Sequence, residues 1–213
     1  MIELYNYELS GNCFKIRLLC SFLNIEYQSN NIEFYPSEEH KSDEFLKINP
    51  LGQIPVISDD GFVLRDAQAI LIYLSTKYDK SENWYPNNDP EKIGLISQWL
   101  AFADSITGSA SAARLHDTFF YTNFDIEECR AAAHSQFRIL DEHLYFQEQL
   151  NQSWICDGEK PTLADIACFP YVALSEEGGV SRISYPAIRR WLDRFKRLDG
   201  FIIMPGMFPS GPG

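Results

Sequence analysis

The apolar positions of the first eighty residues change repeatedly between short β-type runs and helical spacing. Residues 14–23 are apolar on most sides and predict a buried helix that ends near Asn24. Asp59-Asp60-Gly61 separates two short β runs and is a strong hairpin signal. The predicted elements of this half are, in chain order, a strand over 2–5, a helix over 14–23, a strand over 27–34, a helix over 42–48, strands over 54–57 and 62–64, and a helix over 66–74.

A polar stretch that contains two prolines, residues 80–90, separates this pattern from a different one, and we interpret it as a domain linker. Beyond it the apolar spacing predicts helices only. Pro90 suits the first turn of a helix, and Thr162 with Asp165 predicts a capping box. The predicted elements are a long helix from Pro90 through Phe102, a second over 126–150, a helix that starts at Thr162, a helix over 186–198, and an irregular tail over 200–213.

Composition and charge narrow the classes of function. The chain has 213 residues, of which 45% are hydrophobic, and 30 acidic and 18 basic side chains give a formal charge of −12. The apolar content is too high for a disordered acidic chain. The acidic balance argues against nucleic acid as a partner, because phosphate binding needs clustered lysine and arginine. A small anion can still bind, since a helix N-terminus can hold one inside a negative field.

The cysteines and the N-terminus indicate the compartment. Five cysteines, at positions 13, 20, 129, 156 and 168, are an odd number with no C-x-x-C pair, which argues against a disulfide framework or a metal site. The first ten residues lack the basic start and apolar run of a signal peptide, and no stretch approaches the roughly 18 apolar residues of a membrane span. We expect a soluble cytoplasmic protein that does not bind membranes.

Four segments carry a resemblance to the glutathione transferase family. Leu9-Ser10-Gly11-Asn12-Cys13 resembles the catalytic-serine loop of the theta, delta and related bacterial classes, and residues 39–42 with 49–55 resemble the segment that ends in the family's cis-proline. Residues 65–70 stand where the family has an acidic residue, serine, any residue, alanine and isoleucine. Residues 162–166 match the capping box of the family's C-terminal domain.

The resemblance implies both a fold and a reaction. The implied fold is an α/β thioredoxin-like N-terminal domain (residues 1–80), a linker (81–90) and an all-α helical C-terminal domain (91–213). The motifs resemble those of a serine-type, theta- or delta-like bacterial member of the family. The resemblance also implies a homodimer. The implied reaction is detoxification, in which glutathione is the co-substrate that attacks a small hydrophobic electrophile. No metal is implied.

Ser10 is the candidate catalytic residue. It stands between the first strand and a helix N-terminus, where its hydroxyl can donate to the sulfur of a glutathione thiolate. A plain N-cap is the alternative role, which serine often has. Tyr5 and Tyr7 are rivals, because other members use a tyrosine of the first strand, but alignment on Arg17 puts that position at Asn6. Cys13 is another rival, although a buried core thiol is the simpler interpretation.

Two segments are candidates for the peptide part of glutathione. The resemblance implies a cis bond at Ile54-Pro55 that exposes the backbone of Ile54 to the cysteinyl amide, whereas an edge-strand proline is the simpler interpretation. The helix that starts at Asp66 offers free N–H groups to the γ-glutamyl carboxylate, and Asp66 could accept from the γ-glutamyl amine or be an ordinary first-turn acid. Ala67 departs from the pattern, because it removes the usual serine hydroxyl.

Further residues are assigned by position. His40 and Gln53 fall where theta-like members hold the glycyl carboxylate, and Asp104 resembles the acid that reaches the partner subunit's γ-glutamyl amine, although it could also lie on a solvated helix face. The second-substrate pocket is expected between the two halves, where an aromatic cluster at helical spacing could equally be core. Its candidates are Arg114, His116, Phe119, Phe120 and Tyr121.

Three functions are therefore compared. The first is an enzyme in which Ser10 stabilises the glutathione thiolate. The second is a non-catalytic member of the fold, acting as a binding or regulatory protein, that lost the site when Ala67 replaced serine. The third is a thiol reductase that depends on Cys13.

Overall fold

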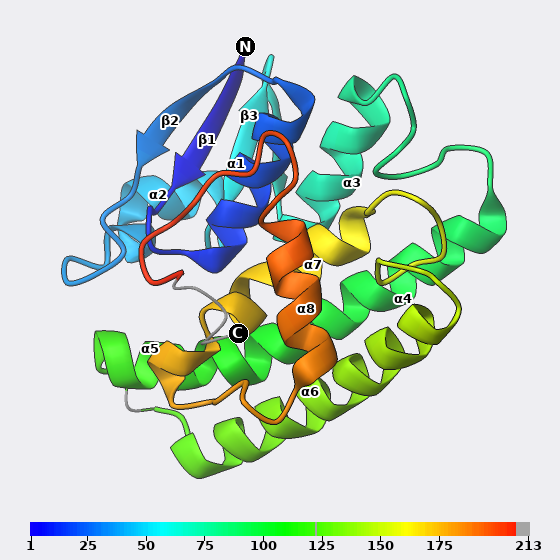
Figure 1. The fold of residues 1–213 in the computed structure, drawn as a ribbon. Coiled ribbons are helices and arrows are strands. Elements are labelled where there is room, and N and C mark those ends of the chain that lie inside the picture. The colour runs from blue at the N-terminus through cyan, green and yellow to red at the C-terminus, as the bar shows by residue number, and fades with distance from the viewer. Residues whose placement is uncertain (122, 208–213) are drawn as a thin grey trace.

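The computed structural model describes residues 1–121 and 123–207. The first half is mixed: β1 (Ile2–Asn6), α1 (Gly11–Leu23), β2 (Tyr27–Asn31), the 3-10 turn η1 (Glu39–Lys41), α2 (Asp43–Ile48), β3 (Val56–Asp59), β4 (Phe62–Arg65) and α3 (Ala67–Tyr78). The second half has helical elements: α4 (Pro90–Ile106), the π-helical turn η2 (Thr107–Ser111), α5 (Ala112–Phe119), α6 (Ile126–Gln149), α7 (Leu163–Ala173), the 3-10 turn η3 (Ser175–Gly178) and α8 (Pro186–Phe195). Figure 1 shows the sheet above the long helices, with α7 between them.

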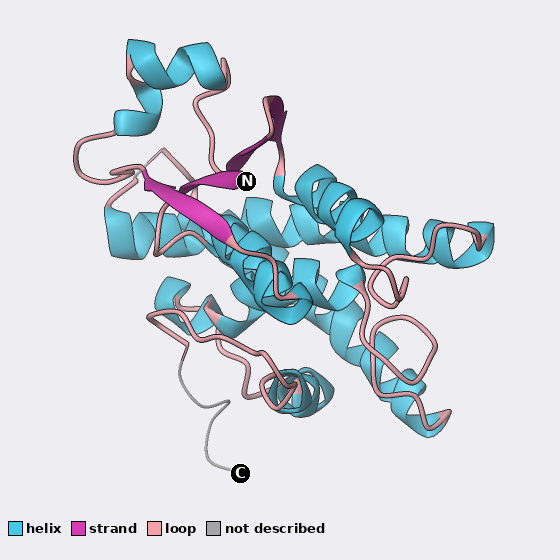
Figure 2. Ribbon diagram, turned by 90° about the horizontal axis from the view of Figure 1, so that it is seen from above, coloured by secondary structure: helices cyan, strands magenta, loops and turns pink. Residues whose placement is uncertain are grey.

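The four strands form one sheet in the order β2-β1-β3-β4, with β1 parallel to β2 and antiparallel to β3, and β3 antiparallel to β4. Helices cover both faces of this sheet (Figure 2). Leu4 and Ile57 pack with α1 and α3 in the main core, whereas Tyr5 packs on the other face, edge-on to Phe45 of α2. The alternation of side chains along β1 therefore assigns its residues to two different layers.

Caps determine where the helices of the first half begin and end. The Ser10 hydroxyl accepts from the Cys13 N–H at 3.2 Å, and Asn24 ends α1 in the left-handed region at φ 52°. Asp66 caps α3 by accepting from the Ala69 N–H at 2.9 Å. Because a cap is a local feature, these helix ends agree with the sequence prediction.

The first long helix of the second half differs from the prediction. The sequence predicts one helix that starts at Pro90, runs through Phe102 and ends near residue 121, whereas α4 ends at Ile106 and a π-helical turn connects it to α5. Thr107 and Ser109 each donate a side-chain hydrogen bond to the carbonyl four residues earlier, at 3.0 and 2.8 Å. Such bonds compete with the regular backbone pattern, and the π-helical turn lies at the same place in the chain.

Two strands differ from the prediction, and the described part of the tail agrees with it. β2 ends at Asn31 instead of residue 34, and β3 spans Val56–Asp59 instead of residues 54–57, after a cis bond between Ile54 and Pro55. Residues 201–207 form no helix or strand, as predicted. The rest of the predicted irregular tail, residues 208–213, lies outside the described residues. The domain boundaries at residues 80 and 90 stay a prediction.

α7 is the central helix of the second half and is buried at every position. Its capping box is present: Thr162 accepts from the Ala164 N–H, and the Asp165 carboxylate accepts from the Thr162 N–H at 2.9 Å. The same carboxylate accepts from the Ile155 N–H at 3.1 Å and from the Trp191 indole at 2.8 Å. Asp165 therefore joins the start of α7 to α8 and to the preceding loop.

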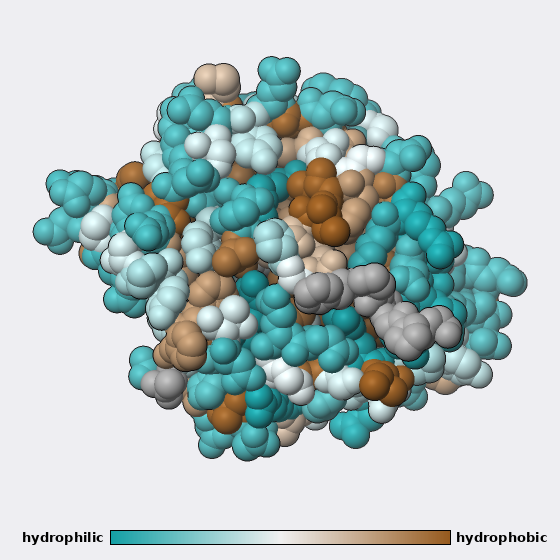
Figure 3. All heavy atoms as spheres, turned by 60° about the vertical axis from the view of Figure 1, so that its left-hand side comes forward, coloured by the Kyte–Doolittle hydropathy of each residue, from teal (hydrophilic) through white to brown (hydrophobic). Residues whose placement is uncertain are grey.

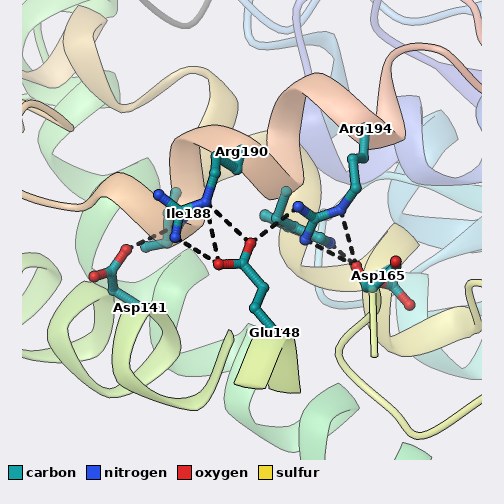
Figure 4. Close-up of polar contacts among 8 residues, drawn as sticks. Asp141, Glu148, Asp165, Ile188, Arg190 and Arg194 are labelled. Atoms are coloured by element: carbon teal, nitrogen blue, oxygen red, sulfur yellow. Dashed lines mark hydrogen bonds and ion pairs between the residues drawn. The ribbon is translucent and has the colours of Figure 1, made fainter. Parts of the chain in front are cut away.

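The outer helices α6 and α8 are joined by charged groups (Figure 4). Glu148 of α6 accepts from Arg190 and Arg194 of α8, with contacts of 2.5 and 3.0 Å, and Asp141 accepts from the Ile188 N–H at 2.8 Å.

On the face in Figure 3 hydrophilic side chains predominate, and hydrophobic ones form several separate patches. Among the described residues, no helix combines the length and apolar character that a membrane crossing requires.

Candidate active site

A cavity of about 590 Å³ lies between the two halves. Its wall comes from the loop after β1, the segment around η1, the cis-proline turn, the start of α3, and the helices α4, α5 and α7 with η2. The lining residues are Tyr7, Leu9, Ser10, Asn12, Phe34, His40, Lys41, Gly52, Gln53, Ile54, Pro55, Asp66, Ala67, Asp104, Thr107, Gly108, Ser111, Arg114, Leu115, Phe119, Tyr121, Phe124 and Tyr171. Every candidate for the peptide part of glutathione is among them.

Ser10 faces this cavity at the N-terminus of α1 and is half-buried. Its oxygen accepts from the Cys13 N–H, and this bond does not use the proton of the hydroxyl. Asn12 follows in the first turn and also lines the cavity, and its buried side-chain oxygen has no hydrogen-bond partner among residues 1–121 and 123–207. The sequence analysis missed Asn12, although its place in the first turn of the helix was a usable signal.

The N-terminus of α1 is held from the second half. The Asn12 N–H donates to the Tyr171 hydroxyl at 3.1 Å. A Cβ on Gly11 would lie 2.6 Å from the Tyr171 ring, so only glycine allows this approach. Arg114 of α5 donates to the Leu9 carbonyl at 2.8 Å and pairs with Glu177. The loop that carries Ser10 is therefore fixed by side chains of the second half.

The rivals of Ser10 lie in different environments. Asn6 is buried away from the cavity and accepts from Arg17 at 3.2 Å. Tyr5 packs against α2, whereas Tyr7 lines the cavity, where burial raises the pKa of its phenol. Cys13 is 0% exposed, and burial raises the pKa of its thiol to about 11. A buried neutral thiol is a poor nucleophile, which argues against a reductase that depends on Cys13.

The cis-proline turn lies opposite Ser10. The Ile54–Pro55 bond is cis, as the resemblance implied, and both residues line the cavity. Asn49 fixes the turn, because its amide donates to the Gln53 carbonyl at 2.8 Å and its oxygen accepts from the Leu51 N–H at 3.2 Å. Gln53, which precedes the cis bond, is exposed to solvent.

Acidic groups surround the start of α3. Asp66 has a positive φ of 76° and uses one carboxylate oxygen as the cap of α3. Ala67 is buried and faces the cavity without a polar side-chain atom. Gln68 donates to the carboxylate of Asp104, which reaches the same cavity from α4. Asp104 thus lies at its own chain's cavity, and its contact with a second copy stays a prediction.

His40 and Lys41 come from η1 and lie where the polar wall meets the aromatic rings. The His40 ring stacks on Phe34 with centroids 4.1 Å apart. Burial and then the neighbouring Lys41 lower the pKa of His40 below its ordinary 6.5, so the ring is neutral at pH 7 and could bind a carboxylate only as an N–H donor. Lys41 donates to the Gly52 carbonyl at 3.1 Å and lines the cavity. The sequence analysis included Lys41 in a motif but missed it as the charged group.

The predicted second-substrate residues separate into two groups. Arg114, Phe119 and Tyr121 line the cavity, whereas His116 and Phe120 do not. His116 points to Asp117, with the ring nitrogen 2.8 Å from the carboxylate. Phe120 ends α5 in the left-handed region and is 72% exposed. Helical spacing does not tell which side of α5 faces the cavity, and a role of these two residues toward the second substrate stays a prediction.

Aromatic rings line the cavity at the end nearest α5. Tyr7 and Phe34 lie 5.6 Å apart between centroids, and Phe34 lies 5.8 Å from Tyr121. Phe119 packs edge-on to Tyr7 at 6.2 Å and to Tyr35 at 5.9 Å. The Tyr121 hydroxyl donates to Glu38 at 3.2 Å, which connects the two halves on this side. The cavity therefore has one polar and one aromatic end.

The arrangement can be compared with known proteins. Residues 4–82 match the glutathione S-transferase N-terminal domain and residues 123–194 match the glutathione S-transferase C-terminal domain. The chain therefore belongs to the glutathione S-transferase family, a family of enzymes. Among residues 1–121 and 123–207, no group of three or more His, Cys, Asp or Glu side chains could hold a metal ion.

Individual relatives agree with this assignment. The chain is 29% identical to the glutathione S-transferase D7 of Drosophila melanogaster over 90% of its own length and 82% of the relative's. A solved glutathione S-transferase of Xanthobacter autotrophicus Py2 superposes with a TM-score of 0.84 at 24% identity, covering 97% of this chain and 98% of that one. Glutathione transferase E6 of Drosophila melanogaster gives 0.82 at 25% identity, over 93% and 88%.

Proposed function

We propose that the protein is a glutathione transferase in which Ser10 stabilises the glutathione thiolate for attack on a small hydrophobic electrophile. One observation supports this most strongly: a single cavity has Ser10 at an α-helix N-terminus, polar groups on one side and aromatic rings on the other. A peptide with charged ends fits the polar side, and an apolar electrophile fits the aromatic side.

Hydrogen bonds from these groups can supply the free energy that is needed to lower the pKa of the glutathione thiol. A free thiol has a pKa near 8.5, so about 3% is thiolate at pH 7. Lowering the pKa by about two units requires roughly 2.7 kcal/mol, which one or two hydrogen bonds to the charged sulfur can supply. Since the intrinsic nucleophilicity of sulfur falls with its pKa, the net gain is only about threefold. Most of the acceleration would come from positioning the electrophile in the aromatic end.

The polar wall suggests how the peptide would lie. The N–H groups at the start of α3 suit the γ-glutamyl carboxylate, with Asp66 and Asp104 near its amine. The backbone of Ile54 would pair with the cysteinyl amide. His40, Lys41 and Gln53 would hold the glycyl carboxylate, with Lys41 supplying the positive charge. These local groups must overcome the overall charge of −12, which repels an acidic peptide.

Ala67 favours one competing function. The family pattern has a serine there, and loss of a hydroxyl that donates to a carboxylate costs about 10–150-fold in affinity. A non-catalytic binding or regulatory protein with a weakened glutathione site would have this substitution. The other polar groups of the wall are present, which is why we favour the enzyme.

Calorimetry of the native protein and of Ala67→Ser tests the proposal. We expect the native protein to bind glutathione, and the variant to bind it about tenfold or more tightly, because the added hydroxyl donates to the γ-glutamyl carboxylate. Absence of binding by both proteins would contradict the proposal. Binding by the variant alone would favour the non-catalytic function.

We further propose a cytoplasmic homodimer that serves detoxification. Exposed apolar side chains support an association with a second copy: Phe62 and Val63 on β4, and Ile139 and Phe146 on α6. Light scattering is expected to give twice the 24.5 kDa of one chain. A mass of one chain at micromolar concentration would contradict the dimer.

A further inference from the structure

A lysine is buried behind the polar wall of the cavity. Lys15 lies on α1, one turn after Asn12, and is 0% exposed. Its ammonium has no hydrogen-bond partner within the described part of the chain, and it lies 5.5 Å from the centroid of the Tyr171 ring. Burial of an unpaired ammonium is costly, and a methionine would fill similar space without that cost. Packing alone therefore does not explain a lysine at this position.

The groups that face Lys15 come from three other helices. Burial lowers the pKa of Lys15 to about 8, and Cys168 of α7, Asp104 of α4 and Asp66 at the start of α3 act in the opposite direction. Burial raises the pKa of Asp104, which Lys15 in turn lowers. Burial also keeps the Cys168 thiol neutral at pH 7 by raising its pKa. Lys15 is therefore faced by the carboxyl groups of two aspartates and by one buried thiol.

Only the carboxylates reach the cavity. Asp66 and Asp104 line it, whereas Lys15 does not. Gln68 holds Asp104 in place, because its amide donates to that carboxylate, and its own buried oxygen has no partner among the residues described. A ligand at the start of α3 thus meets two exposed acidic groups directly, whereas the ammonium of Lys15 is buried and acts on it only through its field.

We propose that Lys15 balances the charge of the subsite formed by Asp66, Ala67 and Asp104, so that this subsite accepts a head group that carries both an ammonium and a carboxylate. This rests on the proposed function, which supplies such a head group as the γ-glutamyl end of glutathione. Without Lys15 the two carboxylates attract the ligand's ammonium but repel its carboxylate. The repulsion matters here because Ala67 contributes no hydroxyl to the ligand's carboxylate.

Lys15 is a positioning residue in this proposal, since it acts through its field and through Asp104 rather than by touching the ligand. Removal of Lys15 should therefore weaken the binding of the ligand's carboxylate and strengthen or leave unchanged the binding of its ammonium. If the lysine were merely structural, its removal would change both affinities in the same direction. This difference in sign allows a sharp test with ligands that retain only one of the two charges.

The test measures affinities for three S-methylated ligands, which have no ionising thiol. They are S-methylglutathione, its glutaryl analogue, which keeps the head carboxylate and lacks the amine, and its 4-aminobutyryl analogue, which keeps the amine and lacks the carboxylate. In Lys15→Met the glutaryl analogue is expected to bind roughly tenfold or more weakly, and the 4-aminobutyryl analogue equally or more tightly. Lys92→Met, on the exposed start of α4, is the control for the same change in net charge.

The native protein gives a second readout that needs no variant. Because the pKa of Lys15 is about 8 and its protonated form favours the carboxylate, the affinity for the glutaryl analogue should fall as the pH rises through 8. The fall should be absent in Lys15→Met and present in Lys92→Met.

Each result supports or overturns a definite statement. Parallel weakening of both analogues in Lys15→Met, or no change in either, would overturn the role of Lys15 while the proposed function stands. Failure of the native protein to bind S-methylglutathione would overturn the proposed function and this inference with it. Opposite shifts for the two analogues would support it.

Discussion

Replacement of Asp165 by alanine is expected to lower the free energy of unfolding by about 3–5 kcal/mol. The carboxylate is 0% exposed and accepts from the Thr162 and Ile155 N–H groups and from the Trp191 indole. Burial raises the pKa of Asp165 to about 6, so the group is ionised at pH 7. Truncation would leave three buried donors without an acceptor in the middle of the core.

Denaturant unfolding at pH 7 measures this cost. Asp89→Ala is a matched control, because Asp89 also caps a helix by accepting from the Lys92 N–H, at 3.1 Å, but does so at an exposed position. The control should lose only about 1 kcal/mol. An equal loss in both variants would show that Asp165 acts as an ordinary cap and does not connect α7 to α8.

Replacement of Ser10 by alanine is expected to lower kcat/KM for conjugation at pH 6.5 by roughly 10–100-fold, with most of the loss in the chemical step. The hydroxyl that donates to the sulfur would be gone, so the pKa of the bound glutathione thiol should rise by about one to two units. A pH titration of the thiolate absorbance in the binary complex measures that pKa directly.

Ser10 also caps α1, so its two roles have to be separated. Glycine at an N-cap costs only a few tenths of a kcal/mol, whereas alanine costs about 1 kcal/mol. Ser10→Gly should therefore lose as much activity as Ser10→Ala while unfolding at a higher denaturant concentration. If the pKa of the bound thiol is unchanged in both variants, the donor is another group that lines the cavity, with Tyr7 and Asn12 as the candidates.

The features that could be predicted from the sequence are mainly local. Asn24, Asp66 and Thr162 define helix ends through their own backbone or through side chains within three residues, and each lies where the sequence placed it. The hairpin at Asp59-Asp60-Gly61 is equally local. The family resemblance added the cis bond at Ile54-Pro55, which no local rule requires.

The features that could not be predicted depend on contacts between distant segments. His116 and Phe120 do not line the cavity, because the side of α5 that meets it is determined by the packing of α5 against η3 and α6. The π-helical turn before α5 has no marked hydrophobic signature. The sequence made no prediction for Lys15, because its burial depends on α7, which lies far away in the chain and places Tyr171 over the ammonium.

The burial of Lys15 under Tyr171 has a consequence for the order of events during synthesis. The segment that forms the sheet and α1 leaves the ribosome long before α7 does, and until then the ammonium of Lys15 is in contact with water. The cost of dehydrating this charge therefore falls on the docking of α7 against α1, and not on the formation of the sheet. Since burial lowers the pKa of Lys15 to about 8, this cost becomes smaller as the pH rises above 8.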